Sequence, residues 1–359
     1  CRQQNIVIKN VREAVYLYRY GQTESYWDKI DINKIQNIEA VLKKRVKGQE
    51  QAVAKVADII SRASLGLSSL QGNHGKPKGV LFFAGPTGTG KTELAKSIAE
   101  YVFGDEAFMI RFDMSEYGQS HSDQKLLGAP PGYVGYSAGG QLTNAIKEKP
   151  FSVVLFDEIE KAHPSILDKF LQILEDGRLT DSAGETVYFS ETLIIFTSNL
   201  GINSKNKYGE LVENVNKDMP YDEMRERVLA SIQDYFKFQI NRPEILNRIG
   251  DNFVVFNYIN EKTAMDILSA KITSFINKLR QEKNIQLYIS ANYSNYLLSV
   301  ALGNLDNGGR GIGNVVETYL VNPLARVLTK GRANKNIQLM FDAPPSALGE
   351  LPKYRVAPM

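Results

Sequence analysis

An apolar run, a glycine-rich loop and a helical pattern follow one another without a break over residues 79–103. Residues 79–84 read Gly-Val-Leu-Phe-Phe-Ala, which predicts a short buried strand, and residues 93–103 carry apolar side chains at helical spacing. Between them, residues 85–92 fit the pattern G-x-x-x-x-G-K-[ST]. A strand, a glycine loop and a helix in this order predict a phosphate-binding loop and therefore a nucleoside triphosphate site.

The loop supplies the candidate nucleotide-binding residues, which are Gly85, Pro86, Thr87, Gly88, Thr89, Gly90, Lys91 and Thr92. Its glycines let backbone N–H groups converge on phosphate oxygens at a helix N-terminus, and the Lys91 ammonium neutralises the β and γ oxygens. The Thr92 hydroxyl is placed to ligate Mg²⁺. A glycine turn without a ligand would have no packing reason for a lysine and a hydroxyl at these positions.

A second apolar run ends in two carboxylates. Residues 151–156 are followed by Asp157 and Glu158, as expected for a central parallel strand that delivers acids to its carboxyl edge. Asp157 is predicted to hold Mg²⁺ and Glu158 to polarise the attacking water. A solvated strand end is the alternative, and the phosphate loop argues against it.

A third strand-like run, residues 192–198, ends in the amide of Asn199. An amide can donate to a γ-phosphate oxygen and accept from water, so Asn199 is a candidate nucleotide sensor; a helix cap or turn residue is the alternative. Three such strands separated by helical stretches predict an α/β fold with a doubly wound parallel sheet and ligands at its carboxyl edge.

Longer motifs carry a resemblance to a known family. They are residues 127–140 with Gly-Tyr-Val-Gly at 132–135, residues 155–164, residues 176–181 and residues 197–201. From Val46 to Phe341 the chain resembles the second AAA+ ATPase module of the Clp unfoldases and disaggregases of the ClpB and ClpC type. The resemblance implies ATP and Mg²⁺ as cofactors, and a small, mainly helical lid domain after the large domain.

The resemblance also implies roles for residues outside the strand ends. Tyr133 and Val134 match the pore loop that grips a threaded polypeptide in a hexamer; a glycine turn with a buried tyrosine is the alternative. Arg248 matches the arginine finger that reaches the nucleotide of a neighbouring subunit, and Arg242 is a weaker candidate for the same surface. For either arginine, an ordinary surface position is the alternative.

Two further residues are assigned to the nucleotide by resemblance. Arg310 matches the arginine of the second sensor, although Gly309 and Gly311 depart from the family's Gly-Ala-Arg-Pro-Leu. These glycines loosen the backbone around the arginine. Val46 matches a position that flanks the adenine.

Composition and spacing divide the chain into four parts. Residues 1–44 read as a helical remnant and connector from an upstream domain, and residues 45–258 as the large ATPase domain. Residues 259–342 have the helical spacing of the lid domain, with a strand expected at 336–341. Residues 343–359 contain several prolines and are expected to be irregular.

The charge balance and hydropathy exclude some classes of protein. Basic and acidic residues number 43 and 40, so the charge balance gives no reason to expect nucleic acid as a partner. No apolar stretch is long enough to cross a membrane, which makes a soluble cytoplasmic protein the default. Proteins of this type that feed the ClpP protease carry a Gly-Phe or Gly-Leu docking loop, whereas residues 206–211 place Glu210 at the anchor, so ClpP is not an expected partner.

Two functions from different classes fit these observations. The first is a homo-hexameric ATPase that pulls unfolded or tagged polypeptides through its pore. The second is a slow, ATP-regulated hexameric scaffold that positions partners for fused upstream domains. A nucleic-acid translocase is a distant third, because it would carry basic pore residues where this chain has Gly-Tyr-Val-Gly.

Overall fold

The computed structural model describes residues 11–22, 24–67, 75–133, 136–205, 208, 210–331, 337–346 and 350–358. The chain divides into two compact units. The first contains the described residues up to Gly85 together with Lys91–Phe256. The second contains Pro86–Gly90 and the described residues from Asn257 onward.

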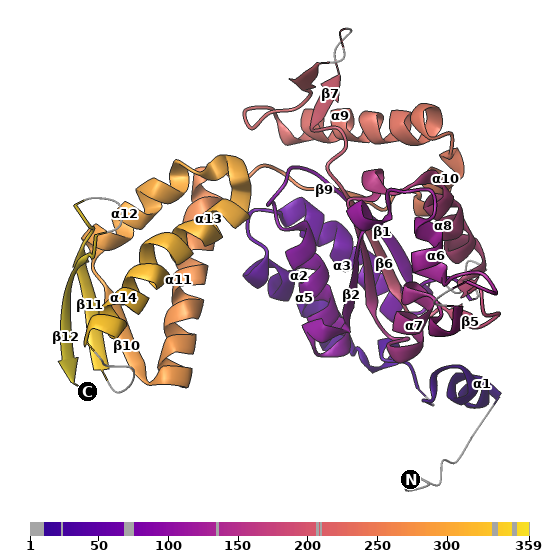
Figure 1. Cartoon of the computed structure of the whole chain (residues 1–359), viewed down its shortest axis with the longest axis horizontal. Coiled ribbons are helices and arrows are strands. Elements are labelled where there is room, and N and C mark those ends of the chain that lie inside the picture. Colours follow the sequence, from indigo (N-terminus) through magenta and orange to yellow (C-terminus); the bar gives the residue numbers. More distant parts are fainter. Residues whose placement is uncertain are drawn as a thin grey trace, which may run out of the picture. The chain divides into compact units, whose positions relative to one another are not determined.

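A five-stranded parallel sheet forms the centre of the first unit (Figure 1). Its strand order is β2-β3-β6-β1-β9, and every neighbouring pair is parallel. The strands are β1 (Gly79–Ala84), β2 (Met109–Asp113), β3 (Val153–Asp157), β6 (Leu193–Ser198) and β9 (Phe253–Val255). The predicted α/β fold with a doubly wound parallel sheet is therefore confirmed.

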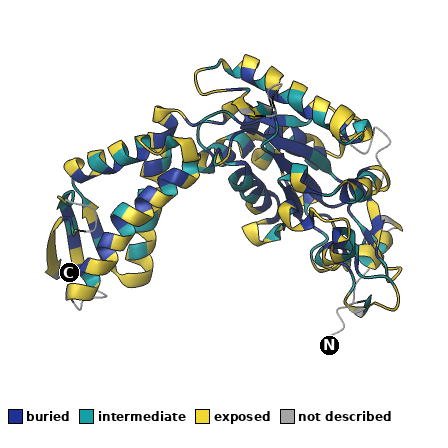
Figure 2. Ribbon diagram, turned by 45° about the horizontal axis from the view of Figure 1, so that its top comes forward, coloured by how far each residue is buried: buried dark blue, intermediate teal, exposed yellow. Residues whose placement is uncertain are grey.

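Helices cover both faces of this sheet, and alternate strand residues face opposite sides. Leu81 of β1 and Leu155 of β3 belong to the hydrophobic cluster that contains residues of α2 (Ile32–Arg45), α3 (Glu50–Ser64) and α5 (Lys91–Phe103). On the other face, Phe156 stacks on Phe196 and contacts Phe170 of α8 (Pro164–Asp176). Figure 2 shows the resulting buried strands between helices whose outer sides are exposed.

The first unit contains five further α-helices and two hairpins among its described residues. Its other helices are α1 (Val11–Tyr20), α6 (Ser122–Leu127), α7 (Gln141–Glu148), α9 (Tyr221–Asp234) and α10 (Pro243–Ile249). Two short antiparallel hairpins pair β4 (Arg178–Thr180) with β5 (Thr186–Tyr188), and β7 (Asn203–Lys205) with β8 (Leu211–Glu213).

The N-terminal segment is part of the first unit's core, so the prediction that the ATPase domain starts at residue 45 is wrong. Trp27 is 1% exposed and lies in the same cluster as Ile38 and Leu42 of α2. Its indole Nε1 donates to the Glu191 carbonyl oxygen at 3.1 Å. These side chains are buried because they pack against α3 and α5. The mixture of aromatic and charged residues in this segment did not indicate that packing.

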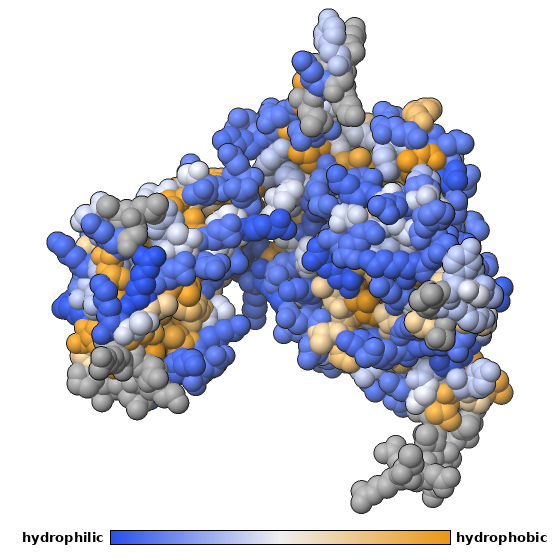
Figure 3. Space-filling view, viewed as in Figure 1, coloured by the Kyte–Doolittle hydropathy of each residue, from blue (hydrophilic) through white to orange (hydrophobic). Residues whose placement is uncertain are grey.

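The outer side of α1 is exposed. Val11 and Tyr18 are 80% and 90% exposed. Figure 3 shows a mostly hydrophilic face with separate apolar patches, one of them over α1 at the lower right. None of the described helices is both long and apolar enough to cross a membrane.

The second unit packs helices against a small sheet. Its helices are α11 (Glu261–Lys283), α12 (Ala291–Leu302), α13 (Gly308–Val316) and α14 (Asn322–Gly331). Its sheet has the order β10-β11-β12, formed by β10 (Ile285–Ile289), β11 (Ile337–Ala343) and β12 (Lys353–Pro358). β11 confirms the strand expected at 336–341.

The expectation of an irregular tail after residue 343 is wrong for residues 353–358. This segment pairs antiparallel with β11, and Arg355 forms an ion pair with Asp342 at 2.7 Å. Its prolines stand before and at the end of the strand, where no ladder hydrogen bond is lost. The strand depends on its neighbour β11, so its own composition did not predict it.

Candidate functional site

The glycine loop has a backbone that only glycine adopts without strain. Gly85, Gly88 and Gly90 have φ values of 141°, 77° and 105°. A Cβ atom at Gly85 would lie 2.6 Å from the Phe256 carbonyl oxygen. Within the second unit, Gly309 N donates to Gly88 O at 2.8 Å. The sequence therefore forms the loop that the phosphate-binding pattern requires.

Lys91 begins α5 and its side chain is buried. Its ammonium donates to the Gly85 carbonyl oxygen at 2.6 Å and to Asn199 Oδ1 at 2.9 Å. Burial of a cation is costly unless oxygen acceptors or an anion surround it. Phosphate oxygens would satisfy this requirement at the loop.

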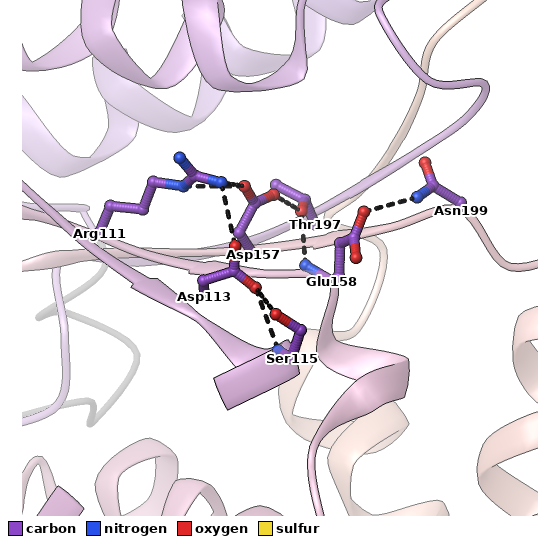
Figure 4. Close-up of polar contacts among 7 residues, drawn as sticks. All are labelled: Arg111, Asp113, Ser115, Asp157, Glu158, Thr197 and Asn199. Atoms are coloured by element: carbon purple, nitrogen blue, oxygen red, sulfur yellow. Dashed lines mark hydrogen bonds and ion pairs between the residues drawn. The ribbon is translucent and has the colours of Figure 1, made fainter. Parts of the chain in front are cut away.

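Asp157 ends β3, and both of its carboxylate oxygens accept hydrogen bonds (Figure 4). Thr197 Oγ1 donates to Oδ1, and Arg111 donates to Oδ2 from Nε at 2.9 Å and approaches it with Nη2 at 2.6 Å. Asp157 is only 8% exposed. The carboxylate is therefore fixed in orientation at the end of its strand.

Glu158 follows directly and has a left-handed backbone, with φ 56° and ψ 56°. Its backbone N–H donates to Thr197 Oγ1 at 3.0 Å, and its Oε1 accepts from Asn199 Nδ2 at 3.3 Å. Left-handed backbone is uncommon for a residue other than glycine and is often found at functional sites. Here it turns Glu158 away from the strand direction and toward Asn199 (Figure 4).

Strand register explains why these residues meet. Asp113 of β2 is paired with Asp157 of β3, and Asn199 follows the last residue of the neighbouring strand β6. Parallel strands present their carboxyl ends at one edge of the sheet. Lys91, Asp157, Glu158 and Asn199, all predicted from sequence, are thus gathered at that edge.

Asp113 adds a second carboxylate beside Asp157. It accepts hydrogen bonds from the Ser115 hydroxyl at 2.6 Å and from the Ser115 backbone N–H at 3.1 Å. The hydroxyl contact is the main cause that holds the pKa of Asp113 below its usual value, and the charge of Arg111 acts in the same direction. Asp113 is therefore ionised at neutral pH.

Metal ligands are few in this region. Among the residues that the structure describes, no group of three or more His, Cys, Asp or Glu side chains could hold a metal ion. Thr92, in the first turn of α5, and Asp157 are the predicted oxygen ligands. This donor set fits Mg²⁺, which takes one or two protein oxygens and completes its shell with water and phosphate.

The remaining predicted site residues belong to other elements of the two units. Val46 follows α2 and is buried in the hydrophobic cluster of the first unit. Tyr133 is 67% exposed, which rules out the alternative of a buried tyrosine, and Val134 lies outside the described residues. Arg310 is exposed in the first turn of α13.

Both arginine-finger candidates form ion pairs with α8. Arg248 binds Glu175 Oε1 through Nη2 at 2.6 Å and through Nε at 3.0 Å. Arg242 binds Asp168 through Nε at 2.6 Å. These arginines therefore occupy one surface of the first unit, formed by α8, α10 and the turn before α10.

Comparisons with known proteins identify the family. Residues 76–252 match the AAA domain of the Cdc48 subfamily. The chain is 40% identical over 319 residues to the ATP-dependent Clp protease ATP-binding subunit ClpA homolog of Cyanidium caldarium, which covers 88% of this chain and 36% of that protein. It is 39% identical over 340 residues to the chaperone protein ClpB of Gloeobacter violaceus, covering 92% of this chain and 37% of that protein. The chain contains a Clp-family AAA+ module.

A third relative is the negative regulator of genetic competence ClpC/MecB of Bacillus subtilis, with 40% identity over 333 residues, which is 92% of this chain and 38% of that protein. This Clp-family module therefore spans a little more than a third of the length of the relatives it matches.

Two residues of this Clp-family module's site were missed in the sequence. Thr197 bridges Asp157 and Glu158, and it is the first residue of the motif 197–201, two positions before Asn199. Arg111 is a charged residue within the strand run 109–113, two positions from the strand's end. A charge at that place in a parallel strand was the available signal.

Proposed function

We propose that this Clp-family module binds ATP with Mg²⁺ and hydrolyses it. The observation that carries the proposal is the continuous contact Lys91–Asn199–Glu158, with Asp157 beside it at the same sheet edge. This contact joins the Lys91 ammonium, which can bind phosphates, to the Asn199 amide and to the Glu158 carboxylate, which can take a proton from water. One relative is named as an ATP-binding subunit, which supports the ATP-binding part of the proposal.

Each residue has a defined part in this reaction. The loop N–H groups and Lys91 bind and orient the phosphates, and Glu158 orients the attacking water and accepts its proton. Mg²⁺, held through Thr92 and Asp157, would neutralise developing charge on the phosphate oxygens. Arg310 and Val46 are proposed to contact the nucleotide as well.

The binding step is tested by Lys91→Ala. The variant should lose affinity for a fluorescent ATP analogue by at least about tenfold, because a buried charge contact to phosphate is removed. Lys96→Ala changes the same residue type on the same helix and should bind as the parent does. Unchanged affinity in Lys91→Ala would contradict the phosphate-loop assignment.

We further propose that the module works in a homo-hexamer that threads unfolded or tagged polypeptides. The exposed Tyr133, next to Gly132 with φ 88°, offers a large contact that does not depend on sequence. The Arg248–Glu175 pair is about 40% exposed on both sides, and such surface pairs are worth only about 0–1 kcal/mol. Arg248 could therefore leave Glu175 for a phosphate bound to a neighbouring subunit at a small cost in free energy.

Threading and the scaffold alternative are separated by Tyr133→Ala. If Tyr133 grips substrate, the variant should keep basal ATPase activity near the parent level and lose unfolding of a tagged, folded test protein. Tyr208→Ala removes another exposed tyrosine, 89% exposed, and should leave unfolding unchanged. A parent protein that hydrolyses ATP and assembles but unfolds no tagged substrate would favour the scaffold.

We do not expect the ClpP protease as a partner. The β7–β8 hairpin brackets residues 206–210, of which the structure describes Tyr208 and Glu210, and both are exposed. A carboxylate in an apolar socket costs about several kcal/mol without a partner. Co-sedimentation with ClpP in the presence of ATP would overturn this expectation.

A further inference from the structure

Arg111 occupies the carboxylate that the proposed function assigns to Mg²⁺. It comes from β2, and its side chain is 47% exposed. Both of its contacts to Asp157 fall on one oxygen, Oδ2, at 2.9 and 2.6 Å, while Thr197 occupies Oδ1. In this arrangement each carboxylate oxygen of Asp157 already accepts a hydrogen bond (Figure 4).

A second carboxylate lies within reach of the same guanidinium. Arg111 Nη2 is 3.4 Å from Asp113 Oδ2, and Asp113 is the residue paired with Asp157 across β2 and β3. Asp113 is also held in place by Ser115. Arg111 can therefore leave Asp157 without losing an ionic partner.

Two cations cannot use the same oxygen without cost. A guanidinium and a divalent ion repel each other, and the effect is large within a few ångströms in partly screened protein. Ion pairs to a fixed, mostly buried carboxylate also satisfy it when no metal is bound. Arg111 thus stabilises the Asp157 carboxylate when no metal is bound, and its positive charge disfavours binding of Mg²⁺ to the same carboxylate.

We propose that Arg111 is a positioning residue that competes with Mg²⁺ for Asp157 and transfers to Asp113 when the metal binds. The inference rests on the proposed nucleotide function. It makes the Arg111–Asp113 pair the element that sets how much Mg²⁺ the module needs. A strand-end ion pair with only a structural role would change stability and leave the metal requirement unaltered.

The test measures binding of a fluorescent ADP analogue to the whole chain as MgCl₂ is titrated. Arg111→Gln should lower the half-saturating Mg²⁺ concentration by about tenfold, the scale expected for removing a nearby positive charge. Arg227→Gln is the matched control, because Arg227 is 48% exposed and pairs with Glu223. The control should bind as the parent does.

Background variants show whether the effect passes through Asp157. In an Asp157→Asn background, Arg111→Gln should no longer shift the Mg²⁺ requirement. An undiminished shift there, or no decrease in the single variant, would overturn the proposal. A parent whose analogue binding does not depend on Mg²⁺ would instead contradict the proposed function itself.

A second variant keeps the test independent of whether Arg111→Gln folds. Asp113→Asn removes the alternative partner, so the half-saturating Mg²⁺ concentration should rise by about threefold or more. Thermal unfolding in EDTA, followed in parallel, reports any purely structural loss. A fall or no change in the Mg²⁺ requirement of Asp113→Asn would overturn the transfer to Asp113.

Discussion

Asn199 Nδ2 donates a hydrogen bond to Glu158 Oε1 at 3.3 Å. The other end of the same amide accepts from Lys91 Nζ at 2.9 Å, which fixes the orientation of the amide. Glu158, proposed to activate the attacking water, and Lys91, proposed to bind phosphate, are therefore linked through one side chain. A γ-phosphate that draws Lys91 toward itself would also release Asn199 from its present geometry.

Glu158→Gln should still bind ATP and hydrolyse it far more slowly. The amide keeps the size and the contact to Asn199 but cannot accept a proton, and loss of a general base costs about 10²-fold or more in rate. Steady-state phosphate release and binding of the fluorescent analogue measure the two properties separately. Equal hydrolysis rates in the variant and the parent would exclude Glu158 as the base.

Thr197→Val should impair both hydrolysis and stability. The substitution keeps the shape but leaves Asp157 Oδ1 and the Glu158 N–H without their buried partner, at a cost of about 1–3 kcal/mol. Thr192→Val is the control, since Thr192 is equally buried and its hydroxyl donates to the Phe189 carbonyl oxygen rather than to a site residue. Urea unfolding should show a lower free energy of unfolding in both variants. ATPase assays should show a loss of activity larger than the loss of folded protein only in Thr197→Val.

If the module forms the proposed hexamer, Arg248→Ala subunits mixed with parent subunits should reduce ATPase activity by more than their mole fraction. The reason is that an arginine acting on a neighbour's nucleotide disables a site that its own subunit does not carry. Arg227→Ala subunits serve as the control. A strictly proportional loss would mean that Arg248 acts within its own chain or not at all.

Trp27→Ala should lower the free energy of unfolding by about 3–5 kcal/mol, because it opens a cavity in the core of the first unit. Trp27 is the chain's single tryptophan, so unfolding is followed by circular dichroism rather than fluorescence. Tyr18→Ala, at a 90% exposed position, should change stability little. Similar losses in both variants would place Trp27 outside the core.

Tyr117→Phe should make the first unit less sensitive to alkaline pH. Burial raises the pKa of Tyr117 from 10.0 to about 12, so the folded state keeps the proton that the unfolded state loses. Stability from this group is complete below pH 10 and is lost as the pH rises toward 12. The variant lacks this loss and also lacks the hydrogen bond to Gln141 at 2.6 Å, so it starts about 1 kcal/mol less stable at pH 8.

Denaturant unfolding at pH 8, 10, 11 and 12 checks this prediction. The stability curves of the parent and Tyr117→Phe should approach each other as the pH rises, cross at about pH 11, and leave the variant the more stable protein at pH 12. Parallel curves across this range would contradict the role of Tyr117.

The site residues that were predicted from the sequence all belong to short, contiguous sequence motifs. The glycine loop that leads to Lys91, the Asp157–Glu158 pair and Asn199 each follow an apolar run, and parallel strands bring the ends of such runs together. Thr197 and Arg111 were missed because their roles depend on which strands are neighbours. That order, β2-β3-β6, follows from packing of the whole sheet.

The same reason explains the two errors in the fold. The burial of Trp27 requires the surfaces of α3 and α5, and β12 requires the free edge of β11. Neither segment has a strong pattern of its own, so tertiary contacts decide its structure. Segments with a strong pattern of apolar residues, such as α5 and β6, were predicted from their own sequence.

The packing of Trp27, Ile38 and Leu42 decides where this protein can be shortened. A truncation that starts at the apparent motif boundary near residue 45 would strip an apolar layer from α3 and α5 and leave an adhesive surface exposed to other molecules. Such a fragment would be recovered as aggregate and would be mistaken for an inactive enzyme. Any minimal ATPase cut from this chain has to retain the helices that precede its motifs.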